Sequence, residues 1–287
     1  MEQLTERIAS ISPQTILLVV AALTAARALL QGARVAAARF ASELCESVLI
    51  ALVLVFLVLR PFVVQSFFIP SGSMHPTLWE GDHILVNKWS YRFAKPKPGE
   101  VVVFRAPKDA APDEKEFIKR LIGVPGDVIE VREGYVTAGT GREPTRYTHS
   151  EIRAVLGSGR SVSEASDMGA EPLRLTTDAI WLGRRKITPA EFARAAGKAG
   201  QPVRIVPGKV LRNDVQLCED YAAEDPEYHW GPREIPEGDL FVLGDNRNQS
   251  HDSHKWGMLP QERIIGRAEI VFWPFKNFKR ISHDCAP

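Results

Sequence analysis

Two serines on a short, stiff loop could supply a nucleophile. The stretch SFFIPSGSMHPTLWEGD, residues 66–82, places Ser71 and Ser73 on either side of a glycine. Pro70 and Pro76 flank this group, and their fixed φ angles favour a rigid loop that exposes one hydroxyl. On its own such a stretch is more often a plain turn. The serines therefore indicate catalysis only if a base stands elsewhere in the chain.

A lysine about forty-five residues further on could be that base. It stands in FIKRLIGVPGD, residues 117–127, whose apolar run is typical of a strand. On a strand, Phe117, Lys119 and Leu121 point to one face, so the amine has apolar neighbours. Burial lowers the pKa of a lysine by up to about 3–5 units, and the neutral amine can then deprotonate a serine. The alternative is a lysine at a strand edge whose amine reaches water.

A third stretch is rich in polar groups that could support such a pair. It reads LGDNRNQSHDSHKWG, residues 243–257, and follows an apolar run. Ser250 could hydrogen-bond a buried amine, and Asp252 could pair with Arg120 or another cation. The alternative for both residues is a loop in contact with water.

Composition and spacing argue against several other chemistries. The 287 residues are 45% hydrophobic and 25% charged, and the net charge of +1 gives no basic excess for nucleic acid. No metal site is expected at His251 and His254, because no cysteine or second cluster completes a tetrahedral ligand set. Cys45 lies beside an apolar run. Cys218 and Cys285 could form a disulfide in an oxidising compartment, but the sequence does not show that they meet.

The residues that could do chemistry lie among short apolar runs separated by Gly/Pro turns. This pattern predicts a mainly β catalytic domain, either sandwich-like or barrel-like. The expected strands are residues 83–86, 100–104, 117–122, 128–131, 239–243 and 264–273.

The middle of the chain interrupts this pattern. Residues 134–207 are polar and rich in Gly, Ser and Arg, which predicts an irregular insertion into the β domain. Within it, Thr188-Pro-Ala-Glu191 is typical of a helix start, since Thr caps, Pro fits the first turn and Glu completes a capping box. The expected helix ends at about Ala199.

Two apolar segments precede the β domain. Residues 8–26 hold no charge, and nineteen residues at about 1.5 Å each would cross a hydrocarbon layer of about 30 Å. The second run, residues 47–59, is shorter, but Arg60 could reach the interface and let a helix continue to Val64. We therefore expect an anchor in residues 1–64 with transmembrane helices at about 9–30 and 45–64. A cleaved signal peptide is disfavoured by the acidic N-terminus.

The arginines between the two segments predict the orientation of this anchor. The connection carries Arg27, Arg34 and Arg39, whereas the N-terminal tail carries Arg7 alone. By the positive-inside rule the connection is cytoplasmic. The domain formed by residues 65–287 is then expected on the outer side of the membrane.

Three ordered stretches together resemble the motif boxes of bacterial type I signal peptidase, the membrane-bound Ser-Lys serine protease also called leader peptidase. They are IPSGSMHPTL, FIKRLIGVPGD and GDNRNQSHDS. The resemblance covers about residues 66–132 and 207–273 and leaves most of the insertion unmatched. It implies a signal-peptidase-like β fold behind a two-helix anchor.

The resemblance implies roles for single residues. Ser73 aligns with the nucleophile and Lys119 with the general base. Ser71 aligns with the hydroxyl that forms the oxyanion hole together with the Ser73 backbone N–H. No cofactor and no metal are implied.

Further residues align with supporting positions of the family. Ser250 matches the serine that orients the lysine amine, while Asp252 and Arg120 match a supporting ion pair. His254 departs from the family, which often has arginine there, so the local network could be weaker or pH-sensitive.

The implied activity is removal of N-terminal signal peptides from exported preproteins after small residues, in the pattern Ala-x-Ala. Shallow pockets for these residues would be lined by Phe67, Ile69, Ile84, Val103 and Ile118, for which plain core packing is the alternative. The implied partners are preproteins and membrane lipid, with no nucleic acid. The enzyme is expected to be a monomer in the bacterial inner membrane, with its catalytic domain on the periplasmic side.

Other functions fit the same residues less well. A self-cleaving, repressor-type Ser-Lys peptidase would lack the anchor and carry a DNA-binding domain. A catalytically dead, membrane-tethered binding module would not need both Ser73 and Lys119. A metal enzyme using His251 and His254 would lose activity with chelators.

Overall fold

The structure of the chain is a computed structural model. It describes residues 13–31, 36–53, 64–140, 143–157 and 171–282. The chain forms two compact units, Met1–Gln65 and Ser66–Pro287.

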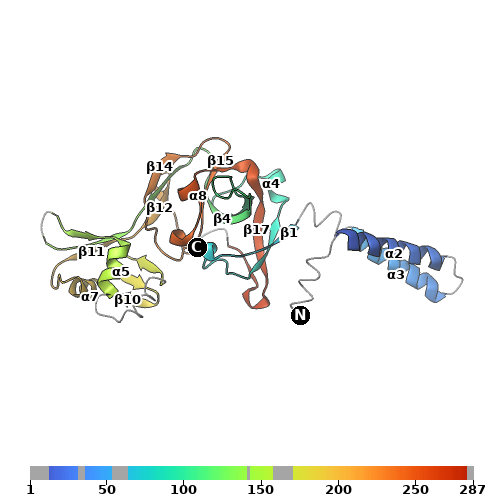
Figure 1. The fold of residues 1–287 in the computed structure, drawn as a ribbon, viewed down its shortest axis with the longest axis horizontal. Coiled ribbons are helices and arrows are strands. Elements are labelled where there is room, and N and C mark those ends of the chain that lie inside the picture. Colours follow the sequence, from blue (N-terminus) through green and yellow to red (C-terminus); the bar gives the residue numbers. More distant parts are fainter. Residues whose placement is uncertain (1–12, 32–35, 54–63, 141–142, 158–170, 283–287) are drawn as a thin grey trace. The chain divides into compact units, whose positions relative to one another are not determined.

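The described part of the first unit contains two helices, α2 (Pro13–Gln31) and α3 (Ala36–Val53), which lie side by side (Figure 1). Arg27 of α2 and Glu46 of α3 form an ion pair of 2.8 Å. Within the described residues, neither helix is both long and apolar enough to cross a membrane. The second predicted span, 45–64, continues into residues 54–63, which lie outside the described part of the chain.

The second unit is built around a curled eight-stranded sheet (Figure 1). Its strands run in the order β1-β2-β17-β3-β4-β15-β16, with β18 paired to β17. Their bounds are β1 Val64–Phe68, β2 His83–Asn87, β3 Val101–Arg105, β4 Glu116–Gly123, β15 Asp239–Leu243, β16 Leu259–Pro260, β17 Ile264–Trp273 and β18 Lys279–Arg280.

A second, four-stranded sheet has the order β13-β12-β5-β14. A short turn leads from β4 of the first sheet into β5 of the second. The strands of the second sheet are β5 Val128–Arg132, β12 Lys209–Arg212, β13 Val215–Gln216 and β14 Trp230–Glu234. All six strands predicted from the sequence are present within one residue or two of the expected bounds, so the mainly β fold is confirmed. Short helical turns complete the domain: η2 Gly72–Met74, α4 Ser90–Phe93, η3 Arg247–Gln249, α8 Ser253–Trp256, η4 Gln261–Arg263 and η5 Phe275–Asn277.

Alternation along β4 decides which core each of its side chains joins. Phe117 and Leu121 pack in one apolar cluster, on the face that also carries Lys119. Ile118 and Ile122 point the other way and pack in two different clusters. The strand is therefore covered by apolar side chains on both faces, which is why a lysine in its middle is buried.

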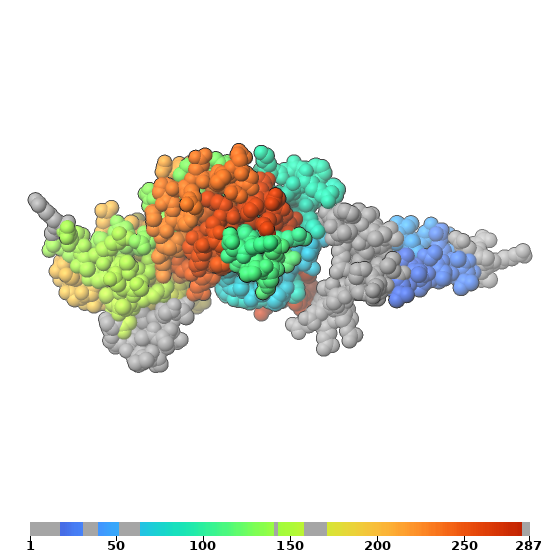
Figure 2. Space-filling view, turned by 45° about the horizontal axis from the view of Figure 1, so that its top comes forward, coloured from blue at the N-terminus to red at the C-terminus, as the bar shows by residue number. Residues whose placement is uncertain are grey.

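The connection between β3 and β4, residues 106–115, lies against the C-terminal part of the chain (Figure 2, green against orange and red). Arg263 donates to the carbonyl oxygen of Ala106 at 3.1 Å. The His251 ring nitrogen lies 3.2 Å from the carbonyl oxygen of Ala110. His251 thus fastens a loop, and the described residues contain no group of three or more potential metal ligands.

The insertion is regular, which corrects the expectation of an irregular segment. Its described residues, 134–140, 143–157 and 171–207, form two three-stranded sheets, β11-β6-β7 and β10-β9-β8, and two helices. The bounds are β6 Tyr135–Ala138, β7 Thr145–Tyr147, α5 His149–Gly157, β8 Leu173–Leu175, β9 Ile180–Leu182, β10 Arg185–Ile187, α7 Pro189–Ala195 and β11 Val203–Val206. The polar composition hid this structure because its apolar residues are few and are spread over short strands.

The insertion has an apolar core of its own. Among the described residues nine buried side chains form it, including Val136, Ile152 and Phe192, and all nine come from residues 136–205. The predicted helix start is confirmed, because Thr188 caps α7 and makes the reciprocal capping box with Glu191. The helix ends at Ala195, four residues before the expected end.

The insertion leaves the β domain at the turn of a hairpin. Strands β5 and β12 are antiparallel neighbours, and Arg132 stands opposite Lys209. The two ends of the insertion are so close that a Cβ on Gly134 would lie 2.6 Å from the backbone nitrogen of Gly208. Residues 134–207 therefore replace a tight turn between two paired strands.

Candidate active site

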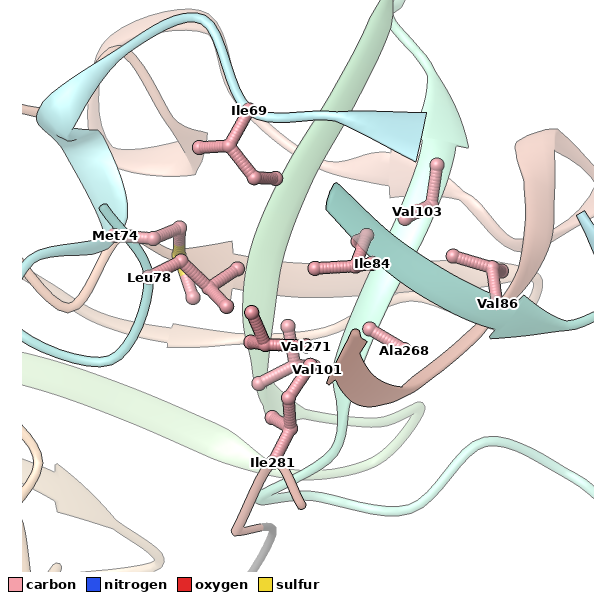
Figure 3. Packing of buried hydrophobic residues seen from close by; sticks show 10 residues of the cluster. All are labelled: Ile69, Met74, Leu78, Ile84, Val86, Val101, Val103, Ala268, Val271 and Ile281. Atoms are coloured by element: carbon pink, nitrogen blue, oxygen red, sulfur yellow. The ribbon is translucent and has the colours of Figure 1, made fainter. Parts of the chain in front are cut away.

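Ser73 is carried by η2, a single turn that is anchored in the main apolar core. The next residue, Met74, is fully buried, and Leu78 packs beside it (Figure 3). Leu78 N–H also donates to the Met74 carbonyl oxygen at 2.9 Å. Because the buried methionine fixes the turn from below, the neighbouring serine hydroxyl is held at the edge of the core.

The two ends of the serine-bearing loop are joined by backbone hydrogen bonds. Ile69 N–H donates to the Asp82 backbone carbonyl oxygen at 2.9 Å, and Gly81 N–H donates to the Ile69 carbonyl oxygen at 3.0 Å. The His75 ring and the Glu80 carboxylate lie 2.6 Å apart across the loop. These two side chains pack closely over the turn, since a Cβ on Gly72 would come within 2.7 Å of the Glu80 carboxylate. The loop is thus rigid, as its flanking prolines predict.

Lys119 meets Ser73 directly. Its Nζ lies 2.8 Å from Ser73 Oγ and also donates to the Ile118 carbonyl oxygen at 2.9 Å. The lysine is only 4% exposed. Burial lowers its pKa to about 8, although the negative charges of Asp252 and Asp245 oppose this shift. The strand-edge alternative, in which the amine reaches water, is therefore wrong.

A loop after β15, residues Gly244–Asp252, holds the serine turn from the other side; we call it the polar loop. Asn246 N–H donates to the Ser73 carbonyl oxygen, and its side-chain amide donates to the Gly72 carbonyl oxygen, both at 3.1 Å. Gly244 lies so close that a Cβ there would collide with the Ser73 carbonyl and the Ser250 hydroxyl. Sequence reasoning assigned no role to Asn246 or Gly244, although both stand in the matched box GDNRN.

Arg120 finds a different partner from the expected one. Its guanidinium forms two hydrogen bonds to Asp245, at 2.8 and 2.7 Å, and both side chains are buried. Asp252 is therefore not the ion-pair partner of Arg120. The signal that could have found Asp245 is its place two residues after the end of a buried strand, beside the neighbouring strand that carries Arg120.

Asp252 instead organises the polar loop and the following turn. Its carboxylate accepts Gly244 N–H at 2.9 Å and lies 2.6 Å from the His254 ring nitrogen. Burial acts to raise the pKa of this carboxyl, but the hydrogen bonds from His254 and Gly244 outweigh it, and the pKa is lowered. The His254 ring stacks on Tyr228, with centroids 3.9 Å apart. His254 thus braces the polar loop through Asp252.

The other predicted residues of the site are near it, with different degrees of burial. Ser71 precedes the serine turn, and its exposed hydroxyl makes no capping hydrogen bond. The Ser250 hydroxyl is buried and has no hydrogen bond of standard geometry within the described residues. The five predicted pocket residues share one apolar cluster: Ile69, Ile84 and Val103 are buried members, and Phe67 and Ile118 are partly buried against it.

Cys45 is free. The disulfide that could join Cys218 to Cys285 concerns a residue outside the described part of the chain.

The site therefore combines a hydroxyl, a buried amine of low pKa and a rigid backbone turn. A neutral amine at hydrogen-bonding distance from a hydroxyl can act as its base. Backbone N–H groups at such a turn can bind an oxyanion.

Comparison with known proteins agrees with this chemistry. The signal peptidase I of Leptolyngbya laminosa is 32% identical over 72% of this chain and 68% of its own length. A probable signal peptidase I-2 of Synechocystis is 31% identical, covering 76% and 66%. The signal peptidase I of Pseudomonas fluorescens is 33% identical, covering 75% and 69%. This chain thus spans about two thirds of the length of these relatives.

A solved structure of a signal peptidase I from Enterococcus faecalis is 18% identical, and the match covers 61% of this chain and 97% of that one with a TM-score of 0.21. The family described as signal peptidase, peptidase S26, matches residues 41–162 and 193–273, more than half of the chain. With these relatives and this match, the chain belongs to the signal peptidase family, peptidase S26, and is a serine peptidase.

Proposed function

We propose that this peptidase removes signal peptides from exported preproteins with a Ser73–Lys119 dyad, cutting after small residues in the pattern Ala-x-Ala. The observation that carries the proposal is the 2.8 Å separation of Ser73 Oγ and the buried Lys119 Nζ, at an amine whose pKa is lowered to about 8. Family membership supports the class of substrate.

The proposed reaction has two halves. The neutral Lys119 amine accepts the Ser73 proton while Ser73 Oγ bonds to the carbonyl carbon of the last signal-peptide residue. The negative oxygen is stabilised by the Ser73 N–H and the Ser71 hydroxyl, one such donor being worth about 3–4 kcal/mol. Lys119 then gives its proton to the leaving amine of the mature protein. A water molecule, deprotonated by Lys119, finally attacks the acyl carbonyl carbon; the bond from that carbon to Ser73 Oγ breaks, and Lys119 returns the proton to Ser73 Oγ.

The other polar groups support the dyad in this proposal. Asn246 holds the serine turn through the Gly72 and Ser73 carbonyl oxygens. Arg120, the residue after Lys119, pairs with Asp245 and so fixes β4 against β15. Asp252 orders the polar loop, and the buried Ser250 hydroxyl supports the orientation of the Lys119 amine.

Specificity for small residues is supported by the wall behind the serine turn. Ile69, Ile84 and Val103 are at most 2% exposed, so they belong to the packed core. Phe67 and Ile118 cover this core only in part. Because packed side chains fill this wall, a small substrate residue such as alanine fits over it better than a large one.

We also propose that residues 1–64 anchor the enzyme and that residues 65–287 act on the periplasmic side of the inner membrane as a monomer. Exposed apolar rings on the catalytic domain support contact with lipid. They are Phe68, Trp79, Phe275 and Phe278, each about half exposed or more.

The test is cleavage of a preprotein with an Ala-x-Ala site, in detergent, across a wide pH range. We expect wild type to cut after the final alanine, and Ser73→Ala and Lys119→Ala to be inactive. The exposed Lys108 and Ser66 give matched controls, Lys108→Ala and Ser66→Ala, which should keep full activity. Full activity in Lys119→Ala would reject the dyad.

The pH profile has a definite sign. Below about 8 the Lys119 amine is protonated in the folded enzyme and cannot accept the serine proton. Activity should therefore rise with pH through about 8 and level off above it, well before the ordinary lysine pKa of 10.5. A limb that rises only near 10.5 would contradict a buried amine.

A further inference from the structure

A segment far from Ser73 in the sequence lies directly behind the polar loop. It runs from Glu219 to Glu227, between β13 and β14, and we call it the strap. None of the three motif boxes includes it. Hydrogen bonds and ion pairs join it both to the polar loop and to the insertion, so it connects the two.

Glu219 holds the polar loop through a buried arginine. Its carboxylate pairs with Arg247 at 2.6 Å, and the Arg247 side chain has no exposed surface. Arg247 Nε in turn donates to the Gly244 carbonyl oxygen at 3.0 Å. Gly244 is the residue that lies against the Ser73 carbonyl. Without a carboxylate at position 219, the guanidinium would be a buried charge without its counter-ion, which is strongly destabilising.

Later residues of the strap bind the same loop. Asn248 donates to the Asp225 carbonyl oxygen at 2.9 Å and accepts Glu227 N–H at 2.8 Å. Ala223 N–H donates to the Asp245 carbonyl oxygen at 3.2 Å. These bonds fix the strap to the polar loop at three points.

An aromatic ring of the strap covers the residue next to the dyad lysine. The Tyr221 ring lies 3.9 Å from the guanidinium carbon of Arg120. Such stacking on a buried arginine excludes water from the Arg120–Asp245 pair. Burial raises the pKa of Tyr221 to about 12, so the ring is neutral throughout the working range.

The other side of the strap is fastened to the insertion. The Asp225 carboxylate accepts backbone N–H groups from Leu175 at 2.8 Å and Gly208 at 3.4 Å. Gly134 N–H donates to the Pro226 carbonyl oxygen at 3.3 Å. Arg153 of α5 lies 3.4 Å from Glu227 and 3.9 Å from Glu224.

We propose that the strap couples the insertion to the catalytic machinery, with Glu219 as a positioning residue for the Ser73 turn and Asp225 as the link to the insertion. The inference rests on the proposed function for its kinetic test. Glu219 acts through Arg247 and Gly244, and Asp225 acts by keeping the strap in place. The insertion, which has no part in the chemistry itself, thereby fixes the geometry of the site.

The test compares full-length Glu219→Gln and Asp225→Ala with wild type. Asp225→Asn keeps an acceptor oxygen and is the rescue variant, while Glu237→Gln, at an exposed turn, is the matched control. Three quantities are measured: kcat and KM for a signal-peptide substrate, the thermal midpoint, and hydrogen exchange of amides in residues 243–250. The last reports on the polar loop without any need for activity.

We expect kcat to fall about 10- to 100-fold in Glu219→Gln and Asp225→Ala, because small displacements of a nucleophile have effects of this size. KM should stay within about twofold, and exchange in residues 243–250 should become faster. Asp225→Asn should recover most of the rate, and Glu237→Gln should match wild type.

Other outcomes overturn the inference. If wild type cleaves and Glu219→Gln keeps its kcat and its slow exchange, the strap has no positioning role, and the proposed function stands. If both variants only lower the thermal midpoint while the folded fraction keeps the wild-type kcat, Glu219 and Asp225 are merely structural. If wild type does not cleave, the proposed function fails, and unchanged exchange in Asp225→Ala would separately remove the coupling.

Discussion

Lys119 shows how burial and charge compete at a single residue. Burial favours the neutral amine, whereas the carboxylates of Asp245 and Asp252 favour the ammonium form. Burial has the larger effect, partly because each carboxylate is already engaged by another group, Arg120 in one case and His254 in the other. The arrangement keeps negative charge near the amine while limiting its effect on the pKa.

Gly244 determines how closely the polar loop approaches the nucleophile. A methyl group there would collide with the Ser73 carbonyl and the Ser250 hydroxyl. We predict that Gly244→Ala lowers kcat by about 100-fold or more, since a displacement of about 1 Å has effects of that size. The control is Gly238→Ala; a Cβ at this exposed turn meets no atom within 4 Å, although its φ of +84° costs some stability.

Kinetics and the thermal midpoint, measured together, check this prediction. Gly244→Ala should lose rate out of proportion to stability, and Gly238→Ala should lose stability with little change in kcat. A Gly244→Ala enzyme with wild-type kcat would mean that the loop can withdraw without moving the serine.

The packing of helix α7 against the rest of the insertion depends on one large side chain. Phe192 is fully buried in the core of the insertion and meets the Tyr147 ring edge-on, with centroids 5.3 Å apart. We predict that Phe192→Ala destabilises the insertion by about 3–5 kcal/mol. Because the core of the insertion is small, that loss is enough to unfold it.

Hydrogen exchange resolved by segment is the appropriate measurement. Amides of residues 135–206 should lose protection in Phe192→Ala, while those of β3, β4 and β17 should keep it. An exposed phenylalanine, Phe93, gives the control variant Phe93→Ala, which should change neither region. Loss of protection throughout the catalytic domain would show that the insertion and the β core unfold as one unit.

The whole catalytic domain is a β core with a second folded module set into one hairpin. The apolar cluster of the insertion is distinct from the three clusters of the core. Arg132 and Lys209 are already paired where the insertion begins and ends. We predict that replacing residues 134–207 by Asn-Gly leaves a folded β core, because this dipeptide favours a tight hairpin turn.

Circular dichroism and cooperative thermal unfolding would check the fold of this shortened enzyme. Its kcat should nevertheless be lower, since Asp225 loses Leu175 and Glu227 loses Arg153. An aggregated product would contradict the independence of the core. A folded enzyme with full kcat would contradict the coupling through the strap.

The sequence by itself determined the parts of this protein that local rules govern. Alternation on β4 places Lys119 among apolar side chains, and the order of three motifs pairs it with Ser73 across 46 positions of the chain. Turn residues separate the six strands, and the capping box at Thr188 starts α7. The strands, the capping box and the apolar surroundings of Lys119 follow from neighbours in the chain. The pairing of Lys119 with Ser73 was inferred instead from the chemistry of the two residues and from the order of the three motifs.

Only the tertiary structure decided which distant polar groups meet. Asp245 and Asp252 stand in the same loop, and the loop sequence does not say which carboxylate turns toward Arg120. Sheet pairing settles it, because β15 lies beside β4 and brings Asp245 to the guanidinium. The fold of the insertion and the contacts of the strap were hidden for the same reason, since they depend on the packing of segments far apart in the sequence.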